Sequence, residues 1–295
     1  MNHSMSPTRR LFLASSLSLT LLTSGHATAA DKIAVTASFS ILGDLVRVVG
    51  GDRVAVTTLV GPNEDAHVFE PKPTDVKAIT RTQLLVTNGL SFEPWATKLA
   101  KSAGYQGETV VASVGVKARP SDPHAWQNPN NVEWYVRNIA AGLSKVDASG
   151  AAIYNANADA YVKELQTLDA WAKAQFLEIL VVNRKAITSH DAFGYFGAHY
   201  QIQFIAPQGM NTEAEPSAKQ VAVLIRQIQR EKIKAIFMEN MSNPKLLAQL
   251  SKDAGATVGA SLYSDALSGP DQAGATYLQM VRHNVTQLAA GMRLN

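Results

Sequence analysis

Three histidines and one aspartate are spaced along the chain in a way that would let them bind one metal ion. His67, His124, His190 and Asp265 each follow a short apolar run that predicts a β-strand. Ligands at the carboxyl ends of strands in two α/β halves can converge between those halves. Because the chain contains no cysteine, such a site would use imidazole nitrogen and carboxylate oxygen rather than thiolate.

The first two histidines also have simpler explanations when each is taken alone. His67 lies in a loop rich in turn-forming and acidic residues, where a histidine is usually solvated, and Asp65 could accept its ring N–H. His124 lies between two prolines and beside Trp126, which could shield a site. The same arrangement is also typical of a stiff surface turn. The argument for a ligand is that the prolines would fix the backbone and so hold the histidine ring in position before a metal binds.

The second half of the chain offers the other two candidates. His190 lies close to a predicted helix start, which disfavours a protonated ring, although a capping turn by Ser189 or Asp191 is the alternative. Asp265 follows a predicted strand, where a turn or helix cap is the common role. Glu239 is either a buried acid near the site or a strand-end cap. The other histidines are expected to be solvated or hydrogen-bonded: His3, His26, His199 and His283.

Short runs rich in β-branched residues alternate with stretches of helical spacing in both halves. The predicted strands are 33–37, 54–60, 84–87 and 109–112, then 186–189, 203–206, 235–238 and 257–260. Helices are predicted in the second half at 192–199, 217–232, 244–254 and 273–292. This alternation indicates an α/β fold of two lobes, residues 31–146 and 181–295, each with a central, mostly parallel sheet flanked by helices.

A segment without proline, residues 147–180, joins the two predicted lobes. Its apolar residues recur three or four apart, and Ser149 is placed to cap the start of a helix. We expect one helix of roughly 30 residues, about 45 Å long; two shorter helices are the alternative. A single helix would favour small closure motions over a wide opening.

The first thirty residues have the order of a secretory signal. Arg9 and Arg10 precede an uncharged apolar stretch, and small residues precede Asp31, so a signal at 1–29 would be removed before the fold begins. Paired arginines followed by Leu-Phe-Leu favour the twin-arginine route, with an ordinary Sec signal as the alternative. Without a cysteine at this boundary, no lipid anchor is expected.

Composition excludes several other classes of protein. Without Arg9 and Arg10 the chain has 25 basic residues against 24 acidic ones, a net charge of +1, and no basic cluster that would indicate nucleic-acid binding. No apolar run after the signal approaches the roughly 20 residues of a membrane-spanning helix. We expect a periplasmic protein, monomeric by default, that neither spans the membrane nor binds nucleic acid.

The motifs around these residues resemble the periplasmic metal-binding receptors of ABC importers, the zinc and manganese group. The resemblance covers essentially the whole mature chain. It rests on the Asp-Ala-His-Val-Phe-Glu-Pro loop at 65–71, Asp-Pro-His-Ala-Trp at 122–126, Thr-Ser-His-Asp-Ala-Phe-Gly at 188–194 and Leu-Tyr-Ser-Asp-Ala-Leu at 262–267.

This resemblance implies two α/β lobes joined by a rigid helix, with His67, His124, His190 and Asp265 as the metal ligands. It also implies an inner-membrane ABC permease as partner, with a metallochaperone as an additional candidate. Two features depart from the family. Ala66 stands where the family usually has proline, and the segment 117–121 is short and lacks the histidines of the zinc receptors' insertion.

The set of ligands favours zinc. Manganese- and iron-type members typically have Glu where this chain has His190, and three imidazoles with one carboxylate suit Zn²⁺ better than Mn²⁺. Cu²⁺, Co²⁺ and a manganese or iron receptor remain alternatives. Protons would compete for the imidazoles, so affinity should fall as the pH drops through the histidine range. The rival classes are a zinc-dependent hydrolase and a receptor for a small organic solute, but the chain has no His-Glu-x-x-His motif, and we expect no enzyme.

Overall fold

The computed structural model describes residues 1–2, 31–214, 216–242, 245, 251–253 and 258–295. Residues 31–295 form one compact unit. The predicted signal at 1–29 and most of the predicted helix at 244–254 lie outside the described residues. Within them, no helix combines the length and the apolar character that crossing a membrane requires.

A four-stranded parallel sheet occupies the first part of this unit, in the order β2-β1-β3-β4. Its strands are rich in apolar residues, which are largely buried in the two central strands and partly exposed in the two edge strands. They are β1 (Ile33–Phe39), β2 (Val54–Val60), β3 (Leu84–Thr87) and β4 (Glu108–Val111), connected through the helices α1 (Ser40–Gly50), α2 (Pro73–Thr80) and α3 (Pro94–Ser102) and the short 3₁₀ helix η1 (Gly51–Arg53). All four strands confirm the sequence prediction to within two residues.

The second half is also α/β, but its sheet is less regular than predicted. Parallel strands β5 (Lys185–Ile187) and β6 (Gln203–Ile205) are followed by single parallel bridges from Ile187 to Ile236 and from Ile236 to Val258. The predicted strand at 235–238 is therefore not continuous, and the described part of the predicted strand at 257–260 forms a single bridge at Val258. Several amides of this segment bond outside the sheet: the Asn295 side chain accepts from the amides of residues 234 and 235, and Ile236 N donates to Lys234 O.

Helices surround this second sheet. They are α6 (Gly194–Tyr200), α7 (Ala218–Glu231) and α9 (Tyr277–Met292), with the 3₁₀ turns η2 (Ala125–Gln127), η3 (Ala148–Gly150) and η4 (Val181–Asn183) elsewhere in the chain. The predicted N-terminus of α7 is confirmed, since Ser217 caps it in a reciprocal bond with Gln220.

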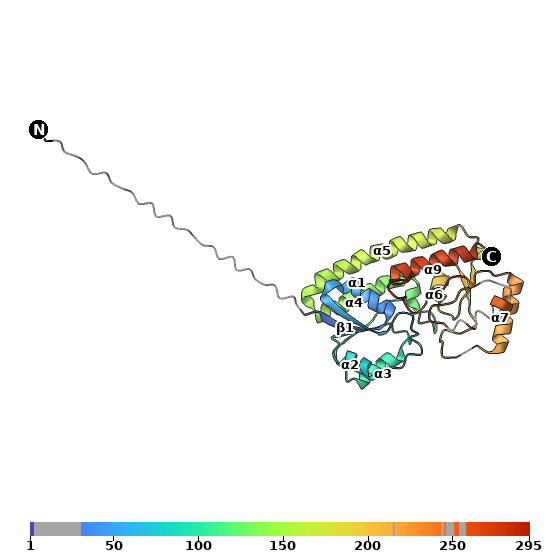
Figure 1. Cartoon of the computed structure of the whole chain (residues 1–295), viewed down its shortest axis with the longest axis horizontal. Coiled ribbons are helices and arrows are strands. Elements are labelled where there is room, and N and C mark those ends of the chain that lie inside the picture. The colour runs from blue at the N-terminus through green and yellow to red at the C-terminus, as the bar shows by residue number, and fades with distance from the viewer. Residues whose placement is uncertain (3–30, 215, 243–244, 246–250, 254–257) are drawn as a thin grey trace. The chain divides into compact units, whose positions relative to one another are not determined.

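The connecting segment forms a single helix, α5 (Ala151–Leu177), of 27 residues. At 1.5 Å per residue it is about 40 Å long. Figure 1 shows α5 extending from the four-stranded sheet to the C-terminal end of α9, and it packs against both α4 and α9. Its start differs from the prediction, because Ser149 lies in η3 and Asp147 accepts from Gly150 N.

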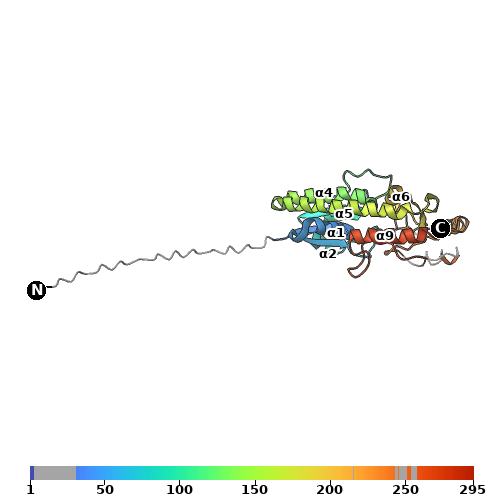
Figure 2. The same cartoon turned by 90° about the horizontal axis from the view of Figure 1, so that it is seen from above.

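The helix α4 (Pro129–Val146) was not predicted, although its sequence contains the signals for it. Asn128 caps it by accepting from Asn130 N, Pro129 occupies the first turn, and its buried residues recur three or four apart. Figure 2 shows α4 lying along α5. α4 packs on β3 and β4 and on the η2 turn that follows His124, whereas α5 packs on α4 and α1.

A buried carboxyl group links the sheet to the loop before α3. Glu93 is 5% exposed, and its Oε1 accepts hydrogen bonds from Ser38 Oγ at 2.9 Å and from the amide of Asn88. Burial raises the pKa of Glu93 to about 7, although these hydrogen bonds lower it. The folded protein therefore holds a proton here that the unfolded chain releases near pH 4.5.

Glu93→Gln is expected to remove a pH dependence of stability. Since the folded state binds more protons between pH 4.5 and about 7, the free energy of unfolding of the wild type falls across this window as pH rises, by about 3 kcal/mol. The amide that replaces the carboxyl group keeps an acceptor oxygen without the charge. Urea unfolding should show equal stabilities near pH 4.5 and a more stable variant at pH 8. Parallel curves for the two proteins would contradict this assignment.

Candidate metal site

The four predicted ligands meet at one point inside the unit formed by residues 31–295. One ligand atom from each of His67, His124, His190 and Asp265 lies within 4.8 Å of the others. Nε2 of His67 is 3.3 Å from Nε2 of His124. Oδ2 of Asp265 is 3.2 Å from Nε2 of His67 and 3.1 Å from Nε2 of His190. A tetrahedral ion with bonds of 2.0–2.1 Å would separate its ligand atoms by about 3.3 Å. The three distances of 3.1–3.3 Å between ligand atoms agree with this value.

The cluster is shielded from water. The side chains of His124, His190 and Asp265 are 0% exposed, and that of His67 is 4% exposed. Among the described residues, the carboxylate oxygens of Asp265 face the ring nitrogens of the cluster and accept from no backbone amide, hydroxyl or side-chain amide. A buried carboxylate without such donors is costly unless a cation compensates its charge. The arrangement therefore fits a cation held between the three rings and the carboxylate.

The charges in the cluster are strongly coupled. Burial lowers the pKa of His190, but the carboxylates of Glu239 and Asp265 outweigh burial and raise this pKa well above its ordinary value. Burial raises the pKa of Asp265, but His190 and His124 outweigh it and hold this pKa well below its ordinary value. A proton can thus take the place of a metal ion here, and binding of a metal must displace it.

Two further carboxylates lie at the Nδ1 side of the His124 and His190 rings, opposite the Nε2 atoms that face the cluster. Asp122 Oδ1 lies 3.0 Å from Nδ1 of His124 and also accepts from its backbone amide. Glu239 Oε2 lies 2.5 Å from Nδ1 of His190, and Oε1 accepts from the His190 amide. With Nδ1 turned to a carboxylate, each ring presents Nε2 to the ion. Glu239 is thus the buried acid that the sequence suggested, whereas Asp122 was missed despite its place two residues before His124.

Asp122→Asn is expected to weaken metal binding by about 10- to 100-fold, because the amide cannot raise the basicity of the His124 ring as a carboxylate does. Asp159→Asn is the control, since the Asp159 side chain is 62% exposed and pairs with Arg137. Calorimetric titration of both variants with Zn²⁺ measures the difference. Equal affinities for Asp122→Asn and the control would show that the carboxylate does not act on the ring.

The loop that carries His67 is fixed without the proline that the family usually has. Ala66 is fully buried, and its carbonyl accepts from Trp95 Nε1 at 2.8 Å. The Phe92 ring packs edge-on against the His67 ring, 4.8 Å between centroids. Asp65 Oδ1 accepts from the backbone amide of His67 at 2.9 Å, and its Oδ2 accepts from Thr212 Oγ, so among the described residues its two oxygens bind these groups and not the His67 ring.

The segment that carries Asp265 is held by the first half of the chain. Trp126 Nε1 and Gln127 Nε2 donate to Ser264 O at 2.9 and 2.7 Å. Leu267 N donates to Ser40 Oγ at 3.0 Å. Trp126 is fully buried with its ring 5.4 Å from that of His124, so it shields the site as predicted and also positions the fourth ligand.

The remaining histidines of the described residues lie elsewhere. His199 Nε2 lies 2.6 Å from Asp169 Oδ1, and His283 Nε2 lies 2.8 Å from Ser261 O. Both are hydrogen-bonded, which confirms the expectation for them. His3 and His26 lie outside the described residues.

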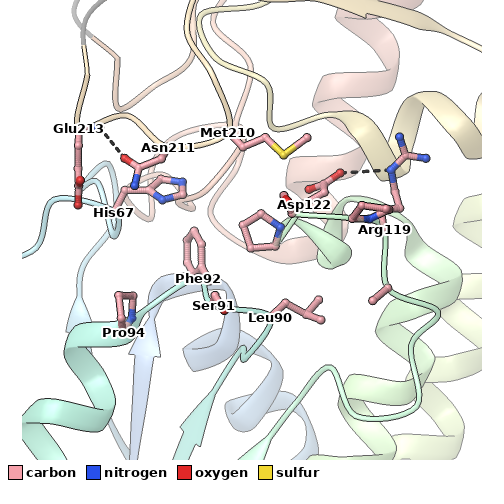
Figure 3. Close-up of a pocket in the computed structure, with 14 residues that line it drawn as sticks. His67, Leu90, Ser91, Phe92, Pro94, Arg119, Asp122, Met210, Asn211 and Glu213 are labelled. Carbon is pink, nitrogen blue, oxygen red and sulfur yellow. Dashed lines mark hydrogen bonds and ion pairs between the residues drawn. The ribbon is translucent and has the colours of Figure 1, made fainter.

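A cavity of about 700 Å³ opens beside the cluster. Of the four predicted ligands, only His67 lines it. Figure 3 shows Met210 and Asn211 facing Phe92 and Leu90 across this space. Leu90 has a φ of 53°, a strained conformation of the kind that concentrates at functional sites.

The sequence profile of one family, the periplasmic zinc-uptake complex component A, matches residues 35–291. The chain therefore belongs to this family, which comprises the solute-binding proteins of metal ABC transporters and not enzymes.

Relatives and solved structures agree with this assignment. The manganese-binding lipoprotein MntA of Halalkalibacterium halodurans is 31% identical over 268 residues, 89% of each chain. The periplasmic zinc-binding protein TroA of Treponema pallidum has the same fold, with a TM-score of 0.85 at 26% identity over 88% of this chain and 99% of its own. A manganese-bound periplasmic metal-binding protein of Candidatus Liberibacter asiaticus has a TM-score of 0.80 at 26% identity, over 88% of this chain and 100% of its own.

Proposed function

We propose that this protein is a periplasmic zinc receptor, which binds Zn²⁺ through His67, His124, His190 and Asp265 and passes it to the permease of an ABC importer. One observation carries the proposal: the fully buried Asp265 carboxylate faces three imidazole nitrogens and, among the described residues, accepts from no backbone amide, hydroxyl or side-chain amide. Three nitrogens and one carboxylate oxygen favour Zn²⁺ over Mn²⁺, which prefers oxygen ligands.

A manganese receptor is the second candidate, because MntA is named as manganese-binding and the Liberibacter protein has been solved with manganese. TroA, which is named as zinc-binding, supports the first candidate. The composition of the proposed ligand set supports zinc. The third imidazole, that of His190, lies 3.1 Å from Asp265 Oδ2, which is consistent with a role as a ligand.

Competition calorimetry on metal-free protein distinguishes the two candidates. At pH 7.5 we expect Zn²⁺ to bind with one ion per chain and at least about a hundredfold more tightly than Mn²⁺, as imidazole-rich ligation favours. Tighter binding of Mn²⁺ would select the manganese receptor. Millimolar or absent binding of both ions would reject a metal receptor and leave the organic-solute alternative.

We also propose how the parts of the chain share this function. Residues 31–146 and 181–295 act as two lobes, and residues 147–180 link them through α5, which packs along α4 and α9 and so supports small adjustments instead of a wide opening. Residues 1–29 act as a cleaved export signal, in agreement with the periplasmic family to which the chain belongs.

A further inference from the structure

Among the described residues, a cavity beside His67 offers the metal a route to the cluster. His124, His190 and Asp265 have fully buried side chains, whereas that of His67 is 4% exposed and lines the cavity of about 700 Å³ (Figure 3). An ion that enters from this cavity meets His67 first. The walls of the cavity on either side of His67 therefore control the route.

One of these walls is tied to the His67 loop by a single carboxylate. Asp65 Oδ1 accepts from His67 N at 2.9 Å, and Asp65 Oδ2 accepts from Thr212 Oγ at 2.7 Å. Within the part of the chain that the structure describes, this second bond is the one hydrogen bond between residues 61–71 and 207–214. Asp65 thus fixes the backbone of a ligand and holds the opposite wall at the same time.

The segment that contains Thr212 belongs to the side of the site that carries His190. Gln208 forms a parallel bridge with His190, and Asp191 N donates to Gly209 O. Gln208 Nε2 donates to Thr212 O at 2.8 Å, which fixes the segment internally. The bond from Thr212 to Asp65 therefore joins the surroundings of His190 to those of His67.

Asp265 and His124 are held independently of this bond. The Asp265 segment is held by Trp126, Gln127 and Ser40, and the His124 ring by Asp122. Breaking the bond between Thr212 and Asp65 would therefore free the cavity wall at His67 without removing a ligand.

We propose that Asp65 and Thr212 are positioning residues that close the route of the metal, so that their hydrogen bond sets the rates of entry and release more than the affinity. The inference rests on the proposed function of the four ligands. A hydrogen bond to a charged group restrains opening, and its loss should raise both exchange rates by about tenfold.

Thr212→Val tests this role, because it keeps the shape of the side chain and removes the hydroxyl; Thr212 is half-buried, so folding is not threatened. Stopped-flow measurements would follow Zn²⁺ entry into metal-free protein and its release to a fluorescent chelator. Both rates should rise about tenfold while the dissociation constant changes less than about threefold. Thr212→Ser should behave as the wild type. Thr286→Val, which removes an exposed hydroxyl that donates to Arg282 O on α9, is the matched control.

Unchanged rates in Thr212→Val would overturn the proposal. So would faster release with unchanged entry, because Thr212 would then stabilise only the bound state. Failure of the proposed function would be recognised separately: a wild-type protein that binds neither Zn²⁺ nor Mn²⁺ would reject both the receptor function and the role of Asp65 and Thr212.

Discussion

Asp265→Asn is expected to lower the affinity for Zn²⁺ by about a thousandfold or more. The carboxylate is the single anionic group among the four proposed ligands, and its Oδ2 lies within 3.2 Å of two imidazole nitrogens. Asparagine keeps the size of the side chain but replaces a charged oxygen by a weaker neutral ligand. Losing a residue that only hydrogen-bonds to a metal ligand costs about 10- to 100-fold in metal affinity. We expect a larger loss of affinity for Asp265→Asn, because this fully buried side chain would contact the metal itself.

Asp271→Asn provides the control for this substitution, since Asp271 is an exposed acid six residues further along the chain. Competition calorimetry should give the control the affinity of the wild type. A loss of less than tenfold for Asp265→Asn would mean that this carboxylate is not a ligand, and circular dichroism on both variants would exclude unfolding as the cause of any larger loss.

Replacing His190 by glutamate, together with Glu239→Gln, is expected to lower the Zn²⁺ to Mn²⁺ affinity ratio by about a hundredfold. The exchange converts three imidazoles and one carboxylate into two of each, the oxygen-rich set that Mn²⁺ prefers. The second substitution is needed because Glu239 Oε2 lies 2.5 Å from His190 Nδ1. Two facing carboxylates in a fully buried position would repel each other, so His190→Glu alone should bind both ions weakly.

Glu239→Gln alone separates the two effects. It keeps the three imidazoles and should weaken both ions by about 10- to 100-fold with little change in their ratio. Titrations of the wild type, the single variant and the double variant with each ion measure the ratio directly. A double variant that retains the wild-type ratio would show that the third ligand does not determine which metal is preferred.

The four proposed ligands could be identified from the sequence because each lies in a short local motif of several recognisable residues. The strands of the first half were predictable for a related reason: their apolar runs and turn signals are local. The helix α4 could also have been predicted, since Asn128 and Pro129 mark its start and its buried positions follow helical spacing.

Other features depend on contacts between distant residues and could not be predicted. The ladder at 234–236 is interrupted by bonds to Asn295, some 60 residues away. Asp65 was expected to act on a ring, but its two oxygens bind the His67 amide and Thr212, which is 147 residues away in the chain. Local patterns predict which residues have metal chemistry, whereas the way in which loops meet determines how those residues are held and reached.

The most direct test of the proposed site is a crystal structure of the zinc-loaded protein with diffraction data collected on both sides of the zinc absorption edge. We expect a single anomalous peak about 2.0–2.2 Å from Nε2 of each of His67, His124 and His190 and from a carboxylate oxygen of Asp265. A peak coordinated by other residues, or a zinc-loaded protein in which these four side chains lie apart, would contradict the proposal that they form the metal site.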